Sequence, residues 1–243
     1  MIKKLIKFIL FLSVVLVVII SYLSFFGIKT EKLNDKIKYE ILKLNQEINL
    51  ELKDVNFLLN PRDLSIRIKT FEPVVTINEN ELKLETIKTN ISLKSFFNKE
   101  FSVDDLQIST KEIKLNNLTL LVRSFKNSPE LFILDNLIKD GFLVGDIDLN
   151  FDKNGKIKKD YEIKGFIKKG KLDIFNRYLI DDMSLFFNIK NKEYSLENIE
   201  VVLNKIKLLS PSIKIKEKDN KFLVNGNLIT NKKDTSFKAL NSL

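Results

Sequence analysis

The chain has 243 residues, of which 44% are hydrophobic and 30% are charged, and this charge is too abundant for a polytopic membrane protein. It has no cysteine, which excludes disulfides and zinc–sulfur sites, and no histidine, which removes the commonest general base and metal ligand. The net charge of +9 invites a nucleic-acid or anionic-lipid partner, but only four of the 41 basic residues are arginine, so a solvated lysine surface is the simpler interpretation.

The first predicted element is a transmembrane helix over residues 8–28, preceded by a seven-residue cytoplasmic tail. This stretch has 21 consecutive residues without a charge, and sixteen of them are Leu, Ile, Val or Phe. At ~1.5 Å per residue such a helix spans about 31 Å, the thickness of a bilayer core. Sixteen such residues favour insertion by roughly 6 kcal/mol. The residues expected to contact the bilayer include Phe8, Leu12, Val15, Ile19, Leu23 and Phe26.

A cleaved signal peptide is the alternative interpretation of this segment. Its apolar stretch is normally 7–15 residues long and ends in a small-x-small cleavage site, which "SYLSFFGIKT" does not offer. A retained anchor is therefore favoured. Lysines flank the segment on both sides, so their count does not set the orientation. Since the short N-terminal tail holds no domain, we expect the bulk of the chain on the far side of the membrane, which in a bacterium is the periplasm.

Residues 29–46 are predicted to form a short amphipathic helix. Leu33, Ile37, Ile41 and Leu44 recur at helical spacing, and Thr30 is a candidate N-cap. This helix is expected to lie against the folded domain or along the membrane surface.

From residue 47 onward the apolar residues alternate with polar ones, which predicts half-buried antiparallel strands joined by short turns. Such alternating runs lie at 48–52, 55–59, 64–68, 75–77, 82–84, 91–93, 113–115, 120–122, 147–151, 161–163, 172–174, 185–189, 199–203, 213–215 and 222–228, and about a dozen strands are expected from them. Asn154-Gly155 is the strongest hairpin signal in the chain.

One helix, near residues 129–140, interrupts the strands. Ser128 is its predicted N-cap, Pro129 its first residue, and Gly141 follows its end. The predicted fold is thus mainly β: an anchor, a short helix, and a curled antiparallel sheet that is either an open groove or sandwich-like.

Each predicted strand has one apolar face, and the few predicted helices cannot cover them all. The remaining apolar faces must therefore contact a second layer, another chain or a ligand. An open, curled sheet would form a groove for acyl chains, whereas a tightly closed one would form a core, and core packing would select the same residues. The candidate groove-lining residues are Leu50, Ile66, Ile77, Leu84, Ile91, Leu93, Leu115, Leu149, Ile163, Phe187 and Val201.

Two motifs resemble ligand-binding loops but lack essential residues. The stretch from Gly165 to Lys171 has the spacing of a P-loop, but Leu172 replaces the hydroxyl that holds magnesium, and a strand follows. The stretch from Asn150 to Tyr161 resembles a calcium loop but ends in Tyr161 where a glutamate is required, so a hairpin turn explains it better. No cofactor and no metal are predicted, and without a positioned nucleophile and base we expect no enzyme activity.

Lysines are dense between residues 153 and 171. They lack the arginines and interleaved aromatics of nucleic-acid binders, so no nucleic-acid partner is expected. The candidates for contact with phospholipid headgroups are Lys158, Lys159, Lys168 and Lys169.

The order of elements resembles the AsmA-like envelope proteins, the group that includes TamB and YhdP. The anchor and the helix "TEKLNDKIKYEILKLN" are followed by "INLELKDVNFLLNPRDLSIRIKTFEP", and "ISLKSFF" leads through a turn with Lys99 and Glu100 into a strand at Val103. The segment "GDIDLNFDKNGKIKKDYEIKGFIKKGKLDI" is similar to the strand pairs of that family. The resemblance covers nearly the whole chain, and it rests on the pattern of residues in successive strands rather than on a catalytic motif.

This resemblance implies an inner-membrane-anchored periplasmic β-groove that assists phospholipid transport or outer-membrane biogenesis. A dozen strands at ~4.8 Å spacing stack to about 55 Å, too short to bridge a periplasm comfortably, so a short member, a truncated frame or one piece of a larger assembly is expected. The alternative function is an anchored β scaffold that binds other envelope proteins through an edge strand without carrying lipid.

Overall fold

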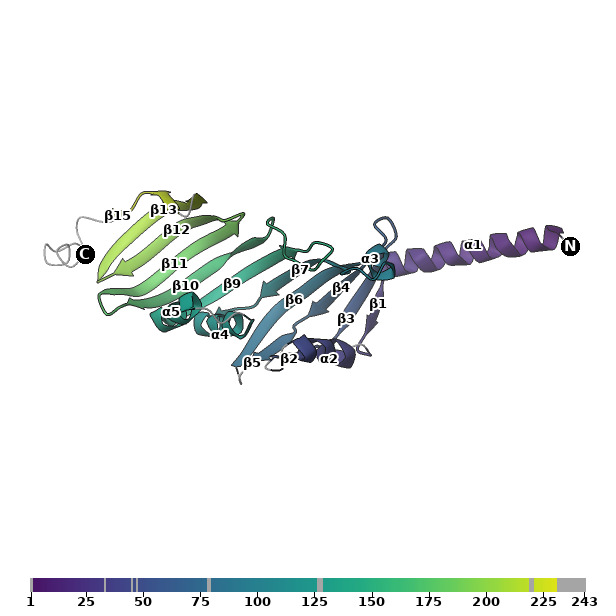
Figure 1. Cartoon of the computed structure of the whole chain (residues 1–243), viewed down its shortest axis with the longest axis horizontal. Coiled ribbons are helices and arrows are strands. Elements are labelled where there is room, and N and C mark those ends of the chain that lie inside the picture. Colours follow the sequence, from purple (N-terminus) through teal and green to yellow (C-terminus); the bar gives the residue numbers. More distant parts are fainter. Residues whose placement is uncertain are drawn as a thin grey trace.

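The alternating pattern produces one open antiparallel sheet, from one end of which an apolar helix projects (Figure 1). The computed structural model describes residues 2–32, 34–44, 46, 48–77, 80–125, 129–218 and 221–230. The helices are α1 (Ile2–Phe25), α2 (Asn34–Leu44), α3 (Leu93–Phe97), α4 (Leu115–Phe125) and α5 (Pro129–Leu137).

The sheet has 15 strands, each paired antiparallel to its neighbours. Its main order is β1-β3-β4-β6-β7-β9-β10-β11-β12-β13-β14, while β2 joins through β5 to β6, β8 pairs with β9, and β15 pairs with β13. The strands are β1 (Ile28–Thr30), β2 (Ile48–Glu51), β3 (Val55–Asn60), β4 (Ser65–Phe71), β5 (Val74–Ile77), β6 (Asn80–Ser92), β7 (Val103–Thr110), β8 (Ile113–Lys114), β9 (Ile138–Asn150), β10 (Glu162–Ile174), β11 (Tyr178–Lys190), β12 (Glu193–Leu203), β13 (Ile206–Lys218), β14 (Lys221–Gly226) and β15 (Ile229–Thr230).

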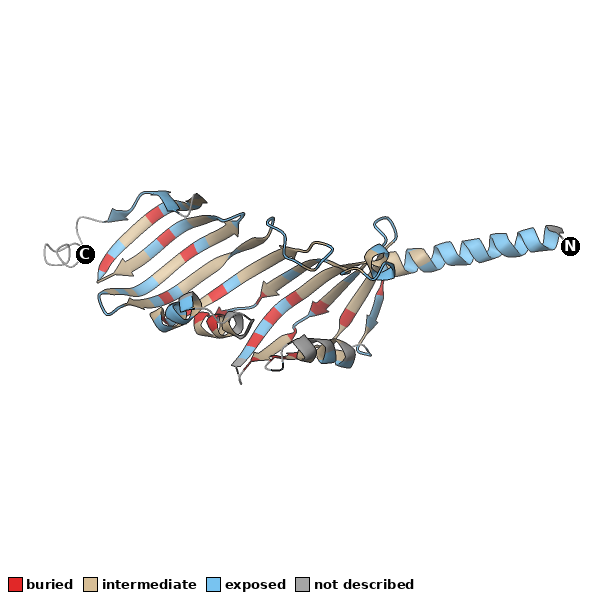
Figure 2. Ribbon diagram, viewed as in Figure 1, coloured by how far each residue is buried: buried red, intermediate tan, exposed pale blue. Residues whose placement is uncertain are grey.

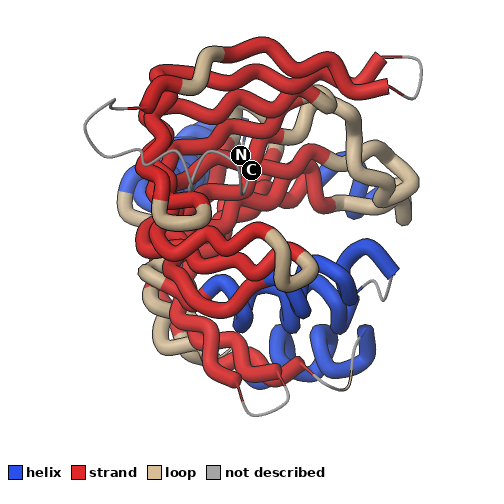
Figure 3. The backbone as a smooth tube through the Cα atoms, turned by 90° about the vertical axis from the view of Figure 1, so that its left-hand side faces the viewer, coloured by secondary structure: helices blue, strands red, loops and turns tan. Residues whose placement is uncertain are grey.

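The predicted fold class is confirmed, and the choice between an open and a sandwich-like sheet is resolved in favour of the open one. Among the described residues no second sheet covers the first. The strands form a curved wall in the end-on view of Figure 3, and α2, α4 and α5 lie along one margin of it (Figures 1 and 3).

The N-terminal helix is longer than predicted at its start and shorter at its end. It begins at Ile2, so the lysines of the predicted tail extend the helix, and it ends at Phe25. Its segment Lys3–Phe25 is long and apolar enough to cross a membrane, and the rest of the chain buries none of its most apolar stretch. Ile28 lies in β1 instead of the helix, because residues 28–30 pair with β3 and form the edge of the sheet.

The second predicted helix forms over a shorter range. Thr30 is not its N-cap, since it pairs with Val55 in the sheet, and α2 begins at Asn34. The amide of Asn34 donates hydrogen bonds to the carbonyls of Leu52 and Lys53, at 2.9 Å each, which fixes the start of α2 against the loop after β2. Leu33 lies outside the described residues.

Three further predictions of secondary structure are wrong. The segment from Leu115 to Phe125 is α4 rather than strand, because its apolar residues also recur at helical spacing and pack on the sheet. Leu93 begins α3, where the hydroxyl of Ser92 accepts the amide of Ser95 and caps the helix. Gly141 lies inside β9, since α5 ends at Leu137. Pro129 does begin α5, as predicted, whereas its predicted cap Ser128 lies outside the described residues.

Gly141 is required by close packing between strands. It has φ +132°, and a Cβ there would lie 2.7 Å from Leu115 Cδ1 and 2.8 Å from the Cα of Gly170. Any larger residue would separate β9 from either α4 or β10.

The buried core lies between the covering helices and one margin of the sheet. It contains Ile48, Ile77, Leu82, Ile113, Leu115, Ile138 and Leu143, each under a tenth exposed. Figure 2 shows how sparse buried residues are elsewhere: most of the sheet is of intermediate exposure. Full burial of one such side chain stabilises the fold by roughly 1.5–3 kcal/mol, so this cluster is a substantial source of stability.

An exposed ion-pair triad ties three loops together at the same margin. Glu72 accepts from the ammonium groups of Lys111, at 2.6 Å, and Lys53, at 3.0 Å. The hydrogen bonds and charges of these lysines lower the pKa of Glu72 from 4.5 to about 2. A lowered pKa stabilises the fold above the unfolded value of 4.5, and this contribution is lost as the pH falls toward 2.

We therefore expect Glu72→Gln to lower the melting temperature of the detergent-solubilised chain at pH 7, and to lower it much less near pH 2. Thermal unfolding followed by circular dichroism checks this expectation. Glu85→Gln removes an equal charge from the adjoining strand and serves as the control. An equal effect of Glu72→Gln at both pH values would contradict the role of the triad.

Candidate functional site

One face of the sheet carries a continuous line of mostly apolar side chains across ten neighbouring strands. Residues directly opposite one another in paired strands project from the same face, so the register places them side by side. This line, called the apolar row below, contains Val55, Thr70, Ile87, Ile108, Ile147, Ile163, Ile189, Tyr194, Ile215 and Val224. At ~4.8 Å per strand the row is about 43 Å long. Most of its members are half-buried, which leaves apolar surface accessible.

From β3 to β13, the residue next to each member of the row forms, together with Lys29 of β1, a line of polar side chains on the opposite face. It contains Lys29, Asn56, Lys69, Lys88, Gln107, Asp148, Glu162, Lys190, Glu193 and Lys216. Ion pairs run along this line, such as Lys216–Glu193 at 2.8 Å and Lys190–Glu162 at 3.6 Å. A hydrogen bond from Asn188 lowers the pKa of Glu162 below its usual value. The sheet is therefore amphipathic, with one face suited to water and the other to apolar matter.

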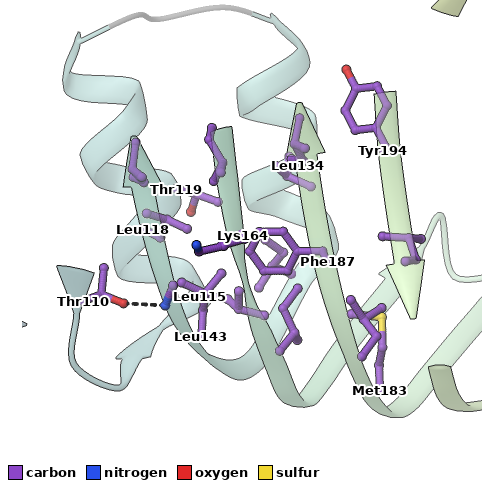
Figure 4. A pocket seen from close by; sticks show the side chains of 18 of the residues that line it. Thr110, Leu115, Leu118, Thr119, Leu134, Leu143, Lys164, Met183, Phe187 and Tyr194 are labelled. Carbon is purple, nitrogen blue, oxygen red and sulfur yellow. Dashed lines mark hydrogen bonds between the residues drawn. The ribbon is translucent and has the colours of Figure 1, made fainter. Parts of the chain in front are cut away.

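A cavity of about 440 Å³ lies on the apolar row, between the sheet and the helices α4 and α5 (Figure 4). Ile147, Ile163, Ile189 and Tyr194 of the row line it, and Leu118 and Leu134 of the helices cover it. An apolar cavity of about 150 Å³ stays dry and binds benzene, so this one, roughly three times larger, has room for a long aliphatic group. The cavity is thus a covered stretch of a row that continues on both sides of it.

Two facing glycines make the cavity deep. Gly145 and Gly165 are opposite each other in β9 and β10, and Phe187 is opposite Gly165 in β11. A Cβ on Gly165 would lie 2.4 Å from the Val144 carbonyl oxygen and 2.9 Å from Phe187 Cζ. The ring of Phe187 therefore lies over a floor that has no side chain of its own.

The two covering helices are joined by a polar cluster. Asp135 of α5 accepts from the Thr119 hydroxyl at 2.7 Å and from Arg123 Nη1 at 2.5 Å, both on α4. The guanidinium of Arg123 also lies over the Phe132 ring, 5.4 Å from its centroid. Because Asp135 and Arg123 are only about a fifth to a quarter exposed, this pair holds the helices together more strongly than a surface pair would.

We expect Asp135→Ala to loosen this cover by about 2 kcal/mol, since it leaves a half-buried guanidinium without its partner. Amide hydrogen exchange in α4 and α5 would then accelerate by about 30-fold, while exchange in β12 stays unchanged. Asp135→Asn keeps an acceptor for Thr119, so its exchange rate in α4 and α5 should lie between the rates of the unaltered chain and of Asp135→Ala. Unchanged exchange in Asp135→Ala would show that packing alone holds the helices.

The structure divides the predicted groove residues into four groups. Leu115, Ile163 and Phe187 line the cavity. Ile66, Ile91, Leu149 and Val201 are half-buried on the face that carries the row. Leu50, Ile77 and Leu84 are buried in the core or close to it, at 5%, 1% and 6% exposure, and Leu93 lies on α3 instead of a strand.

The four predicted headgroup lysines do not form one patch. Lys158 and Lys159 are exposed in the loop between β9 and β10, whereas Lys168 and Lys169 lie at the bulge within β10. At least six strand residues, about 20 Å, separate the pairs. Lys168 is ion-paired with Glu112, so it is the least available of the four.

The two motifs set aside in the sequence are ordinary structure. Gly165 to Lys171 lie within β10 rather than in a loop before a helix. Asp152 accepts the backbone amides of Asn154 and Lys156 in a hairpin turn, and these bonds lower its pKa. Gly155 takes φ +76° there, which confirms the Asn154-Gly155 turn.

The covering helices supply the site residues that the sequence did not reveal. Leu118 was not proposed because α4 was predicted as strand, although the spacing Leu115, Leu118, Val122, Phe125 is helical. Gly145 and Met183 line the cavity through the register of β9, β10 and β11, which no local pattern encodes.

Comparisons of the chain with protein-family models, with curated proteins and with solved structures found no match. The function is therefore inferred from the apolar row, the cavity and α1, and the resemblance to AsmA-like proteins stays a prediction.

Proposed function

We propose that this chain is a membrane-anchored protein of the bacterial envelope that takes the acyl chains of phospholipids into an apolar β-groove. Its role would be to assist phospholipid transport or outer-membrane biogenesis, with α1 in the inner membrane and the sheet in the periplasm. The observation that carries the proposal is the apolar row, which crosses ten strands without a charged residue and includes a cavity.

Three features support lipid as the occupant. An elongated apolar surface beside a polar face matches a molecule with long aliphatic chains and a hydrated headgroup. The lining of the cavity is apolar, so it offers few groups that would select a polar metabolite. Finally, α1 would hold the sheet next to a bilayer, which is the source of such molecules.

Site-specific photocrosslinking in growing cells tests this proposal on the full chain. A photoreactive phenylalanine analogue placed at Ile87, Ile163 or Ile215 should form adducts with phosphate-labelled lipid. The same group at Lys88, Glu162 or Lys214, one residue away on the polar face, should not. Equal labelling on both faces, or none on either, would contradict the groove.

A specific observation favours a second candidate function, the envelope scaffold. No described strand pairs with β14 beyond β13, and Phe222, Leu223 and Val224 on it are 65%, 59% and 66% exposed. Such an edge can accept a strand from a partner protein. Crosslinks from Phe222 to one protein, together with no lipid adducts along the row, would favour the scaffold.

A further inference from the structure

The chain leaves α1 through a short and tightly packed connection to the sheet. Gly27 has φ +70°, and a Cβ on it would lie 2.5 Å from the Phe57 carbonyl oxygen. Ile28 then pairs with Phe57, so the register directs α1 toward the Asn60 end of β3. The orientation of the sheet relative to α1 is therefore set by packing instead of by a flexible linker.

Two other segments lie at this same end of the strands. The turn after β3 ends at Leu64, whose carbonyl accepts the backbone amide of Leu93 at 2.9 Å and thereby joins the turn to α3. Figure 1 shows α3 at the end of the sheet from which α1 projects. If α1 spans a bilayer, the turn and α3 lie at the level of its surface.

These segments expose large apolar side chains. Leu64, Phe96 and Phe97 are 59%, 62% and 77% exposed. Leu64 also has φ +49°, a left-handed conformation that costs a leucine about 1–2 kcal/mol. Strain that presents an apolar side chain to solvent points to a binding surface.

Basic residues lie within two positions of these apolar residues in the sequence. Arg62, Lys94 and Lys99 are all exposed. The nearby acidic residues are engaged: Asp63 accepts from Asn60, and Glu100 pairs with Lys153. We call Leu64, Phe96 and Phe97 with these three basic residues the foot.

We propose that the foot inserts into the interfacial layer of the bilayer that α1 spans, with its apolar side chains among the upper acyl chains and its basic residues on lipid phosphates. Aromatic residues concentrate at this depth in membrane proteins. Each lysine or arginine near an anionic surface contributes about 1 kcal/mol. This proposal rests on the anchoring part of the proposed function and not on lipid transport.

A consequence for lipid transfer follows from the register. Leu59, Ile66, Ile91 and Val103 are directly opposite one another on β3, β4, β6 and β7, at the end of these strands nearest the foot. They share the face of the apolar row and are half-buried. The foot would thus place apolar surface of the groove at the bilayer, where an acyl chain can leave the membrane without crossing water.

The absence of tryptophan from the chain permits a direct test. Phe97→Trp introduces a single fluorophore into the full chain, reconstituted in vesicles of phosphatidylethanolamine and phosphatidylglycerol. We expect blue-shifted emission and strong quenching by lipids brominated near the top of their acyl chains. Leu223→Trp, which is 59% exposed on β14 and opposite Lys216 of the polar face, should emit as in water and resist quenching. Adding Lys94→Glu and Lys99→Glu to Phe97→Trp should weaken the quenching.

The outcomes separate the two proposals. Flotation with the vesicles, together with quenching at position 97 no greater than at position 223, would overturn the foot and leave the anchor intact. Failure to float would overturn the anchor and the foot together. Quenching at position 97 alone supports the foot, whatever the photocrosslinks along the apolar row show.

Discussion

Replacing Ile189 with aspartate is expected to strip phospholipid from the purified full-length chain. Ile189 lies in the middle of the apolar row, opposite Ile163 and Tyr194, and lines the cavity. A carboxylate there would face acyl chains without a partner, at a cost of about 3 kcal/mol, which corresponds to on the order of 100-fold weaker binding. Mass spectrometry of lipid extracted from the purified chain measures the amount retained.

Ser195→Asp is the matched control for this experiment. Ser195 lies on the neighbouring strand β12 but on the polar face, opposite Asn188 and Lys214, so an added carboxylate there meets a lysine and water. Lipid that surrounds α1 is common to both variants, so their difference reports on the groove. If Ile189→Asp, with an unchanged melting temperature, keeps as much lipid as Ser195→Asp, the apolar row does not bind lipid.

The alternation of apolar and polar residues predicts most of the strands and the face on which their apolar side chains lie, although not β1 or the helices that begin at Leu93 and Leu115. Ile147 and Ile163 were assigned to one phase of their strands, and the register places them opposite each other. The hairpin at Asn154-Gly155 was equally predictable, because glycine readily takes the positive φ that the turn requires. Local rules succeed here because each strand buries one face independently of its partner.

The cover of the cavity was not predictable in this way. Residues 115–125 fit both a strand and a helix, and the choice depends on packing: Leu115 and Leu118 contact a cluster drawn from β2, β5, β6, β8 and β9. The pairing of β7 with β9 likewise joins segments separated by two helices, and this pairing completes the apolar row. Contacts between distant segments decide such features, and alternation within one segment carries no information about them.

Whether the sheet is open or closed also depends on contacts between distant segments. The sequence left a groove and a closed sandwich as alternatives, since both bury one face of each strand. In the structure the strands follow one another across a single layer, while α2, α4 and α5 cover one margin of it. The row is buried at Val55 and Thr70, covered by α4 and α5 at the cavity, and 66% exposed at Val224.

Three arginines in α1 are expected to release the chain from the membrane. Leu12→Arg, Val15→Arg and Ile19→Arg each add about 3 kcal/mol to insertion, which together exceeds the roughly 6 kcal/mol that favours the segment. Replacing the same residues with alanine should leave the chain inserted. Alkaline carbonate fractionation measures the shift from pellet to supernatant, and an intact mass of 28.3 kDa in the pellet would show that the helix is retained. A triple-arginine chain that stays in the pellet would mean that α1 is not the main attachment, and it would also remove the premise that places the foot at the bilayer.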